Sequence, residues 1–387
     1  GQGAGFFGSR LMRGSAFLSA LAGCNMAPRY KPATFAYPDN WHGGGVMQPA
    51  GGADTTLAPN WWTMLGDPVL NDLEERAMRL NPDLQAQAEA FLQARDLAME
   101  AKSKLYPQVG GMAGGAKYKG SDHRLWRGAG STGPMYMSSE QYSGTATWEP
   151  DFWSAIRNKT RMAKQNVQER AADYAAARLS LQAELASDYV VLRGLDAQDA
   201  VYQDSIRYYK TAVQITNMRL EGAIAPGMDV SRAEAQLYTT QAQETDIRTQ
   251  RDVMEHAIAA LVNQAPATFH IAPVDGLKFA QGPLPVALPS TLLERRPDIA
   301  AAERRMAQAN RAIGVSRAAF YPHVTFNAMT GFMDNGFDLA SLSNSMYQFG
   351  AQALMPLFQG GLRRADLQRS WSQYREKEDM YRSTVLD

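Results

Sequence analysis

The chain has 387 residues, enough for two or more ordinary domains, and its 39 basic residues balance its 39 acidic ones. Because the formal net charge is zero, no overall field favours nucleic acid or an anionic surface as a partner. No run approaches the roughly 18 apolar residues of a spanning helix, which excludes a helical membrane protein but not a β-barrel, whose strands turn only alternate residues toward lipid.

The only cysteine, Cys24, follows a segment with the order of a secretory signal peptide: two arginines, an apolar stretch and small residues. The residues Leu21-Ala22-Gly23-Cys24 resemble the bacterial lipobox, in which the cysteine is acylated and becomes the first residue of the mature protein. We therefore predict a signal peptide at 1–23 and a lipidated linker at 24–60. Asn25, in place of Asp, favours the outer membrane. The alternative is a lone buried or free cysteine.

A duplicated pattern of prolines organises the chain. In each copy one proline opens a stretch of helix-forming residues, and a second proline lies 25 residues later, where the stretch has ended. These prolines are Pro82 and Pro107 in the first copy and Pro297 and Pro322 in the second, and a further matching pair is Pro150 and Pro356. Proline is favoured in the first turn of a helix and stops a helix that it follows. We therefore predict an internal structural repeat, with helices within 61–107 and 290–321.

At 108–152 and 322–358 the hydrophobic period changes from that of a helix to that of a strand. Apolar and aromatic residues alternate with polar ones over stretches of about ten residues, the length of a tilted membrane strand. Aromatic residues near the strand ends are typical of an interfacial girdle. The residues expected to face a lumen are Ser143, Thr145, Thr147, Thr325, Asn327 and Gln352. For any single strand the alternative is a soluble sheet packed on a core.

Long helices are predicted within 153–263, because from Ile156 to Leu220 there is no proline and only one glycine. Leucines at spacings of three and four predict a coiled-coil-like seam. In the turn at 219–229, Gly222 is expected to adopt the permissive backbone conformation at a helix end, and Asp229 to cap the next helix. The proline-rich stretch 264–289 is interpreted as a connector, and 359–387 as the start of a second long helix.

Several short motifs complete these landmarks. They are Trp61-Trp62 with Leu65-Gly66-Asp67-Pro68, Arg219-Leu220-Glu221-Gly222, Gln264-Ala265-Pro266, Leu293-Glu294-Arg295-Arg296-Pro297-Asp298-Ile299 and Pro356-Leu357-Phe358-Gln359-Gly360-Gly361. Together they resemble the TolC-like outer-membrane factor family, in its lipoprotein branch that serves resistance-nodulation-division (RND) efflux systems (OprM/NodT-like). The resemblance implies an α+β membrane protein. Four strands from each of three protomers would close a twelve-stranded transmembrane β-barrel, which continues as a long periplasmic α-helical barrel with 264–289 at its equator.

The resemblance also implies a function: the outer-membrane channel component of a tripartite efflux pump, a passive exit duct for drugs or other small molecules. The partners would be two further copies of the chain, a periplasmic adaptor protein, an inner-membrane RND transporter and outer-membrane lipid. No nucleic acid, cofactor or metal is expected. In the family the tip of a helical hairpin contacts the adaptor. The matching residues here are Arg219, Glu221, Gly222, Pro226 and Asp229.

Other functions remain open. A duct for type I protein secretion or for metal-ion efflux fits the same fold, and a lipid-anchored coiled-coil scaffold without a pore is the alternative from another class. An enzyme is disfavoured, because the five histidines lack metal-ligand spacing and the carboxylate pair Glu149 and Asp151 has no counterpart in the second copy. Since the second copy ends well before the helices of the first, we also expect a truncated chain or fragment that lacks the second long hairpin.

Overall fold

The computed structural model of the chain describes residues 24–34, 59–123, 135–274, 276, 279, 293, 295–334 and 341–386. The predicted signal peptide at 1–23, residues 35–58 of the predicted linker and most of the predicted connector after residue 274 lie outside the described residues.

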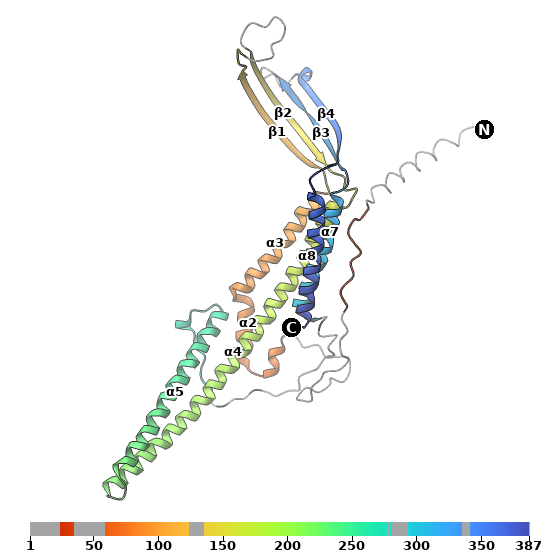
Figure 1. The fold of residues 1–387 in the computed structure, drawn as a ribbon. Helices are drawn as coiled ribbons and strands as arrows, with labels where there is room; N and C mark the ends of the chain where they lie inside the picture. Colours follow the sequence, from red (N-terminus) through yellow and green to blue (C-terminus); the bar gives the residue numbers. More distant parts are fainter. Residues whose placement is uncertain are drawn as a thin grey trace, which may run out of the picture. The chain divides into compact units, whose positions relative to one another are not determined.

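Along the chain, helices are followed by a pair of strands, and this order occurs twice before the last helix (Figure 1). The helices are η1 (Trp61–Leu65), α2 (Pro68–Leu80), α3 (Pro82–Ser103), α4 (Ala155–Glu221), α5 (Gly227–Leu261), η2 (Pro266–Thr268), α7 (Pro297–Ala318), η3 (Leu342–Asn344) and α8 (Leu362–Leu386). The strands are β1 (Gln108–Lys119), β2 (Tyr136–Trp148), β3 (His323–Asp334) and β4 (Ser345–Leu354). None of the described helices is both long and apolar enough to span a lipid bilayer.

Local sequence explains where the helices begin. Helices α2, α3 and α7 each have proline at the first position, where a missing backbone N–H costs nothing. Before α2, an Asp67 carboxylate oxygen accepts hydrogen bonds from the backbone N–H groups of Val69 (2.8 Å) and Leu70 (3.4 Å). Before α3, the Asn81 side-chain oxygen accepts from the backbone N–H of Leu84 at 3.0 Å. These side chains satisfy N–H groups that a helix start leaves unpaired.

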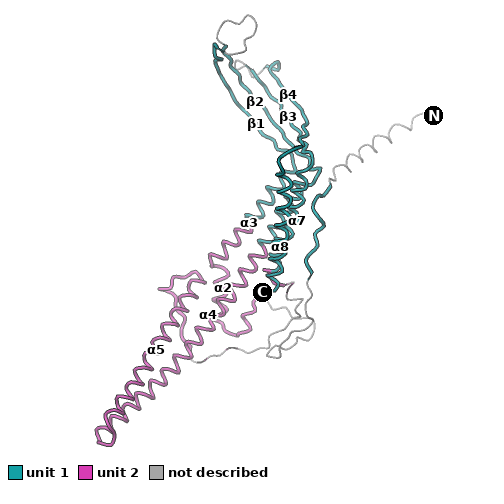
Figure 2. The backbone as a smooth tube through the Cα atoms, viewed as in Figure 1, with its two compact units in different colours: residues 1–34, 92–170, 299–387 teal, residues 35–91, 171–298 magenta. Residues whose placement is uncertain are grey.

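The chain divides into two compact units (Figure 2). The first, called here the sheet unit, consists of residues 1–34, 92–170 and 299–387; the second, the hairpin unit, consists of 35–91 and 171–298. The sheet unit contains all four described strands, nearly all of helix α7 and helix α8. The hairpin unit contains α2, α5 and most of α4.

The sheet has the strand order β1-β2-β3-β4, and every neighbouring pair is antiparallel. Residues directly opposite each other in an antiparallel pair lie on the same face, so the register assigns each side chain to a face. Thr147 is opposite Asn327, and Thr325 is opposite Gln352. Because alternate residues share a face, all six polar residues predicted for the lumen lie on one face of the sheet.

Matching positions of the two copies make matching contacts in the sheet unit. The hydroxyl of Thr160 donates to the backbone carbonyl of Ala101 in the first copy. In the second copy the donor and acceptor positions are exchanged: Ser316, which matches Ala101, donates to the carboxylate of Asp366, which matches Thr160, at 2.8 Å. Just before α4 and α8, Ser154 (φ 58°) and Gly360 (φ 57°) share the left-handed backbone conformation. The duplication seen in the prolines therefore extends to the backbone geometry.

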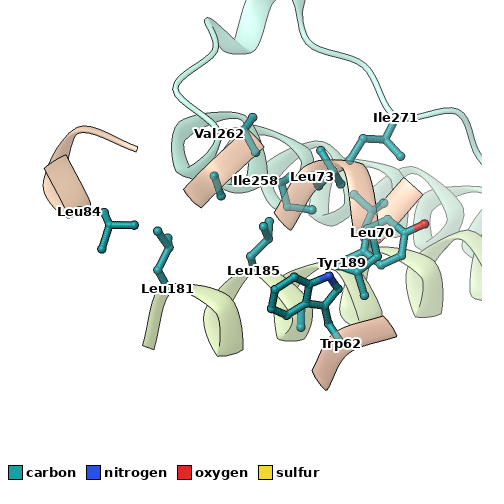
Figure 3. Close-up of a cluster of buried hydrophobic side chains, with 13 residues drawn as sticks. Trp62, Leu70, Leu73, Leu84, Leu181, Leu185, Tyr189, Ile258, Val262 and Ile271 are labelled. Atoms are coloured by element: carbon teal, nitrogen blue, oxygen red, sulfur yellow. The ribbon is translucent and has the colours of Figure 1, made fainter. Parts of the chain in front are cut away.

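The core of the hairpin unit lies where α2, α4 and α5 meet (Figure 3). Leu181, Leu185 and Leu192 of the predicted seam are buried there, together with Ile258 of α5 and Leu70 of α2. Tyr189 is also buried, and its hydroxyl donates to the Asp67 carboxylate at 2.7 Å, so the residue that caps α2 is itself held by α4. Burial of such side chains contributes roughly 1.5–3 kcal/mol each.

Two expectations for the turn between α4 and α5 are wrong by a few positions. The residue with the left-handed conformation is Ala223 (φ 55°), not Gly222. The hydrogen bonds from the backbone N–H of Ile224 to the Arg219 carbonyl (2.8 Å) and of Ala223 to the Leu220 carbonyl (2.9 Å) form a Schellman motif. In that motif Gly222 is the cap and Ala223 the left-handed residue that follows it.

Asp229 does not cap α5. The N-cap is Pro226, with extended φ −75° and ψ 153°, so the helix has already begun at Gly227. Asp229 instead lies in the first turn, where its negative charge interacts favourably with the positive end of the helix dipole.

Candidate functional site

The polar face of the sheet is the first candidate surface. Besides the six predicted residues it carries Gln141 and Gln348. Gln141 is two positions before Ser143, and Gln348 is four positions before Gln352, so each shares the face of that residue. The Gln141 amide donates to the Ser143 hydroxyl at 3.2 Å, and the Thr145 hydroxyl donates to the Gly110 carbonyl at 3.4 Å. The alternation in the sequence already placed both glutamines on this face, but they were not among the residues predicted to face a lumen. This face has the hydrogen-bonding groups of a water-lined surface.

The opposite face is apolar and aromatic in the half nearer the helices, whereas its far end carries Lys117, Lys119, Glu140 and Asp334. Trp148 on β2 stacks on Phe326 of β3, with ring centroids 6.0 Å apart, and the rings of Tyr347 and Phe349 on β4 are 5.9 Å apart. Tyr347 is 78% and Phe349 74% exposed. Three of these rings, those of Trp148, Phe326 and Phe349, line a pocket of about 500 Å³. Its other lining residues are Pro107, Ala146, Thr147, Asn327, Ala328, Gly350 and Ala351. Contiguous exposed aromatic surface of this kind marks contact with another apolar phase or partner.

The two outer strands leave backbone groups without a sheet partner. Among the described strands, β1 pairs with β2 alone and β4 pairs with β3 alone. An open edge presents a row of N–H and C=O groups that template pairing with another strand. The sheet is therefore suited to be completed by strands of further chains.

Aromatic rings and caps tie the sheet to the helices at its base. Trp153 stacks on Tyr321 at 4.6 Å between ring centroids, and the Trp153 indole N–H donates to the Pro322 carbonyl at 2.9 Å. The Asp151 carboxylate accepts from the backbone N–H groups of Ile156 (3.1 Å) and Arg157 (2.7 Å) at the start of α4. Glu149 faces His323 instead, at 3.2 Å. The two carboxylates thus have separate structural roles.

The hairpin tip between α4 and α5 presents the predicted contact residues to solvent. Arg219, Glu221, Gly222 and Pro226 are exposed, and Asp229 is half-buried. The structure adds three large apolar side chains that the prediction missed: Met218, Ile224 and Met228 are 62%, 72% and 58% exposed. Apolar residues inside a glycine- and proline-containing turn were the available signal. The tip is therefore an apolar surface flanked by charged residues.

Cys24, the predicted lipidation site, is an exposed free cysteine at the beginning of an extended segment. Within the described residues no group of three or more His, Cys, Asp or Glu side chains is arranged to hold a metal ion.

Comparisons with known proteins identify the family of the chain. A sequence profile described as outer membrane efflux protein matches residues 73–264 and 288–387. The pyoverdine export outer membrane protein OpmQ of Pseudomonas aeruginosa is 27% identical over 95% of this chain and 76% of that protein. The toluene efflux pump outer membrane protein TtgF of Pseudomonas putida is 28% identical over 90% of this chain and 73% of that protein.

Solved structures have the same fold. The outer-membrane channel OprN, at 26% identity, matches with a TM-score of 0.82 over 94% of this chain and 80% of that one. The CmeC outer membrane channel of Campylobacter jejuni, at 20% identity, matches with a TM-score of 0.84 over 94% of this chain and 77% of that one. Since the family profile covers most of its length, the chain belongs to the outer membrane efflux protein family.

Proposed function

We propose that the chain is the outer-membrane channel of a tripartite efflux pump and acts as a passive exit duct. The observation that carries the proposal is the sheet, which has one polar face, one aromatic face and two open edges. Hydrocarbon does not tolerate unpaired strand edges, so a four-stranded sheet in a membrane must be closed by other strands. Three copies give a closed barrel of twelve strands, wide enough for a polar lumen.

In this arrangement Ser143, Thr145, Thr147, Thr325, Asn327 and Gln352 line the lumen, and the aromatic face contacts lipid. The family membership supports the assignment to efflux. The helices form a periplasmic tunnel, and the hairpin tip, with Arg219, Glu221, Gly222, Pro226 and Asp229, contacts a periplasmic adaptor. The adaptor connects the duct to an inner-membrane RND transporter. Acylation of Cys24 adds a second attachment to the outer membrane.

Cysteine substitution at adjacent strand positions tests the lumen directly. Asn327 lies on the polar face and Ala328 on the aromatic face, so Asn327→Cys and Ala328→Cys differ mainly in what surrounds the thiol. In a planar bilayer, a water-soluble charged maleimide is expected to reduce the current through the Asn327→Cys channel and to leave the Ala328→Cys channel unchanged. Equal reaction at both positions, or no current from the unmodified protein, contradicts the proposal.

A further inference from the structure

Residues 24–34 lie extended along one face of helix α7 in the sheet unit (drawn in red in Figure 1). The Met26 carbonyl accepts from Arg317 at 3.4 Å, and the Pro28 carbonyl accepts from the Asn310 amide at 3.0 Å. The Tyr30 hydroxyl donates to the Glu303 carboxylate at 2.8 Å. Later residues of the segment thus bond to earlier residues of α7, so the two run antiparallel.

The helix positions that receive this segment form a single stripe. Glu303, Asn310, Gly314 and Arg317 are separated by seven, four and three residues, which places them on one side of an α-helix. Asn310 is only 3% exposed. Burial and the hydrogen bond to Glu303 both raise the pKa of the Tyr30 hydroxyl, which therefore remains a donor. The contact is specific along its length rather than a chance apposition.

Gly314 is the point of closest approach. A Cβ atom built at Gly314 would lie 2.7 Å from the Ala27 Cβ, from the Ala27 backbone nitrogen and from the Asn158 amide nitrogen. Backbone atoms cannot move aside as the end of a flexible side chain can, so any larger residue at 314 must displace the segment. Glycine weakens a helix interior by roughly 0.5–1 kcal/mol, and close packing of the segment offsets that cost.

The segment also joins the two copies of the repeat. The fully buried Asn158 of α4, in the first copy, donates from its amide to the Asn25 side-chain oxygen at 3.2 Å. The remaining partners lie on α7, in the second copy. Since α7 ends at Ala318 and β3 begins at His323, the first residues of the segment lie near the base of the sheet.

We propose that residues 25–30 form a docked strap, seated through the notch at Gly314, that holds Cys24 at the level where the helices give way to the sheet. The anchoring role rests on the acylation of Cys24 proposed above. A flexible linker of ten residues has a root-mean-square end-to-end distance of roughly 15–20 Å. Without docking, the distance between the acyl chains and the sheet would therefore vary over that range. The docked strap instead fixes the anchor beside the surface that enters the membrane.

Limited proteolysis of the full-length protein in detergent micelles tests docking. Trypsin can cut the bond after Arg29, whose side chain is exposed, only when the strap lifts from α7. We expect slow release of the N-terminal fragment from the wild type and release on the order of tenfold faster from Gly314→Ala. The matched control is Gly194→Ala in α4, also within a helix, where an added Cβ meets nothing within 4 Å. This control should cut at the wild-type rate.

A second variant guards against general damage to α7. The double substitution Asn310→Ala and Tyr30→Phe removes two strap hydrogen bonds without adding any atom to the notch. It should also speed cleavage after Arg29 while the unfolding temperature stays within a few degrees of the wild type. Unchanged cleavage in both this variant and Gly314→Ala would overturn docking.

The mass of the released fragment separates docking from anchoring. A fragment that begins at Cys24 and carries acyl groups supports the anchor, whereas a fragment without acyl groups overturns the anchoring role even when the cleavage rates support docking. Bilayer currents of the same preparations report the channel function independently, because a loose strap leaves the lumen residues unchanged.

Discussion

At the scale of single residues, Glu74 on α2 is the most unusual side chain of the hairpin unit. It is completely buried, and neither of its carboxyl oxygens has a hydrogen-bond partner in the described part of the chain. Burial raises its pKa from 4.5 to about 8, because the charged form loses its water. The carboxyl group is therefore largely neutral at pH 7 in the folded protein.

This shift predicts a loss of stability as the pH rises. Below pH 4.5 the carboxyl group is protonated in both states; between pH 4.5 and 8 only the unfolded chain releases the proton, which favours unfolding. The contribution of Glu74 to the unfolding free energy should fall by about 1.4 kcal/mol per pH unit in that window. Glu74→Gln should flatten the dependence, measured by urea unfolding of the detergent-solubilised protein at pH 5 and 7.5. The neighbouring exposed residue offers the control Glu75→Gln, which should keep the wild-type slope.

Single residues also show where sequence reasoning reaches its limit. The starts of α3 and α7 are predictable, because proline acts on its own helix turn. In the turn after α4 the predicted left-handed residue is wrong by one position. The prediction assigned this conformation to Gly222 because glycine adopts it most easily, whereas the Schellman hydrogen bonds place it at Ala223. The strap leaves no periodic pattern, and its partner Asn310 is 282 residues away from Pro28 in sequence. Such contacts depend on the tertiary fold alone.

At the scale of elements, a buried ionic cluster fastens the segment after α5 to the hairpin. Arg251 of α5 donates to Asp196 of α4 at 2.6 Å, pairs with Glu255 and donates to the Ile271 carbonyl at 2.5 Å. The Glu255 carboxylate in turn accepts from the Ile271 backbone N–H at 2.9 Å. Every charge in the cluster has a partner, which is what makes burial of charged groups tolerable.

Removal of the Arg251 guanidinium group is expected to lower the free energy of unfolding. Arg251→Met removes one of the two arginines that pair with buried Asp196, which keeps Arg193. It also removes the arginine partner of Glu255. The loss of these buried contacts should lower the unfolding free energy by up to roughly 3–5 kcal/mol. Arg248, one turn earlier on α5, pairs with Asp199 and Glu244 but has a side chain that is 53% exposed. Arg248→Met should therefore cost no more than about 1 kcal/mol. Equal losses in urea unfolding would show that the cluster does not stabilise the hairpin.

For the strands, the sequence predicts which residues share a face of the sheet, but not which medium that face contacts. Alternation alone was sufficient to group Ser143, Asn327 and Gln352, because a strand has a period of two and antiparallel pairing preserves the face. Which medium each face meets depends on the other copies, whose strands are not part of one chain. The assignment of lumen and lipid therefore stays a proposal that whole-channel measurements must decide.

At the scale of the whole molecule, a lysine at two successive positions of β2 should have opposite consequences. Thr145 is on the polar face and Ala146 on the aromatic face. In the proposed trimer, Thr145→Lys places three positive charges around the lumen, so single-channel recordings should show a shift of ion selectivity toward anions with normal assembly. Ala146→Lys places the charge against hydrocarbon at a cost of roughly 2–4 kcal/mol per copy at the bilayer midplane, less toward either interface. Its yield of membrane-inserted trimer should therefore drop while its selectivity stays that of the wild type. The reverse pattern would mean that the faces are exchanged, and loss of insertion in neither variant would mean that the sheet does not meet lipid.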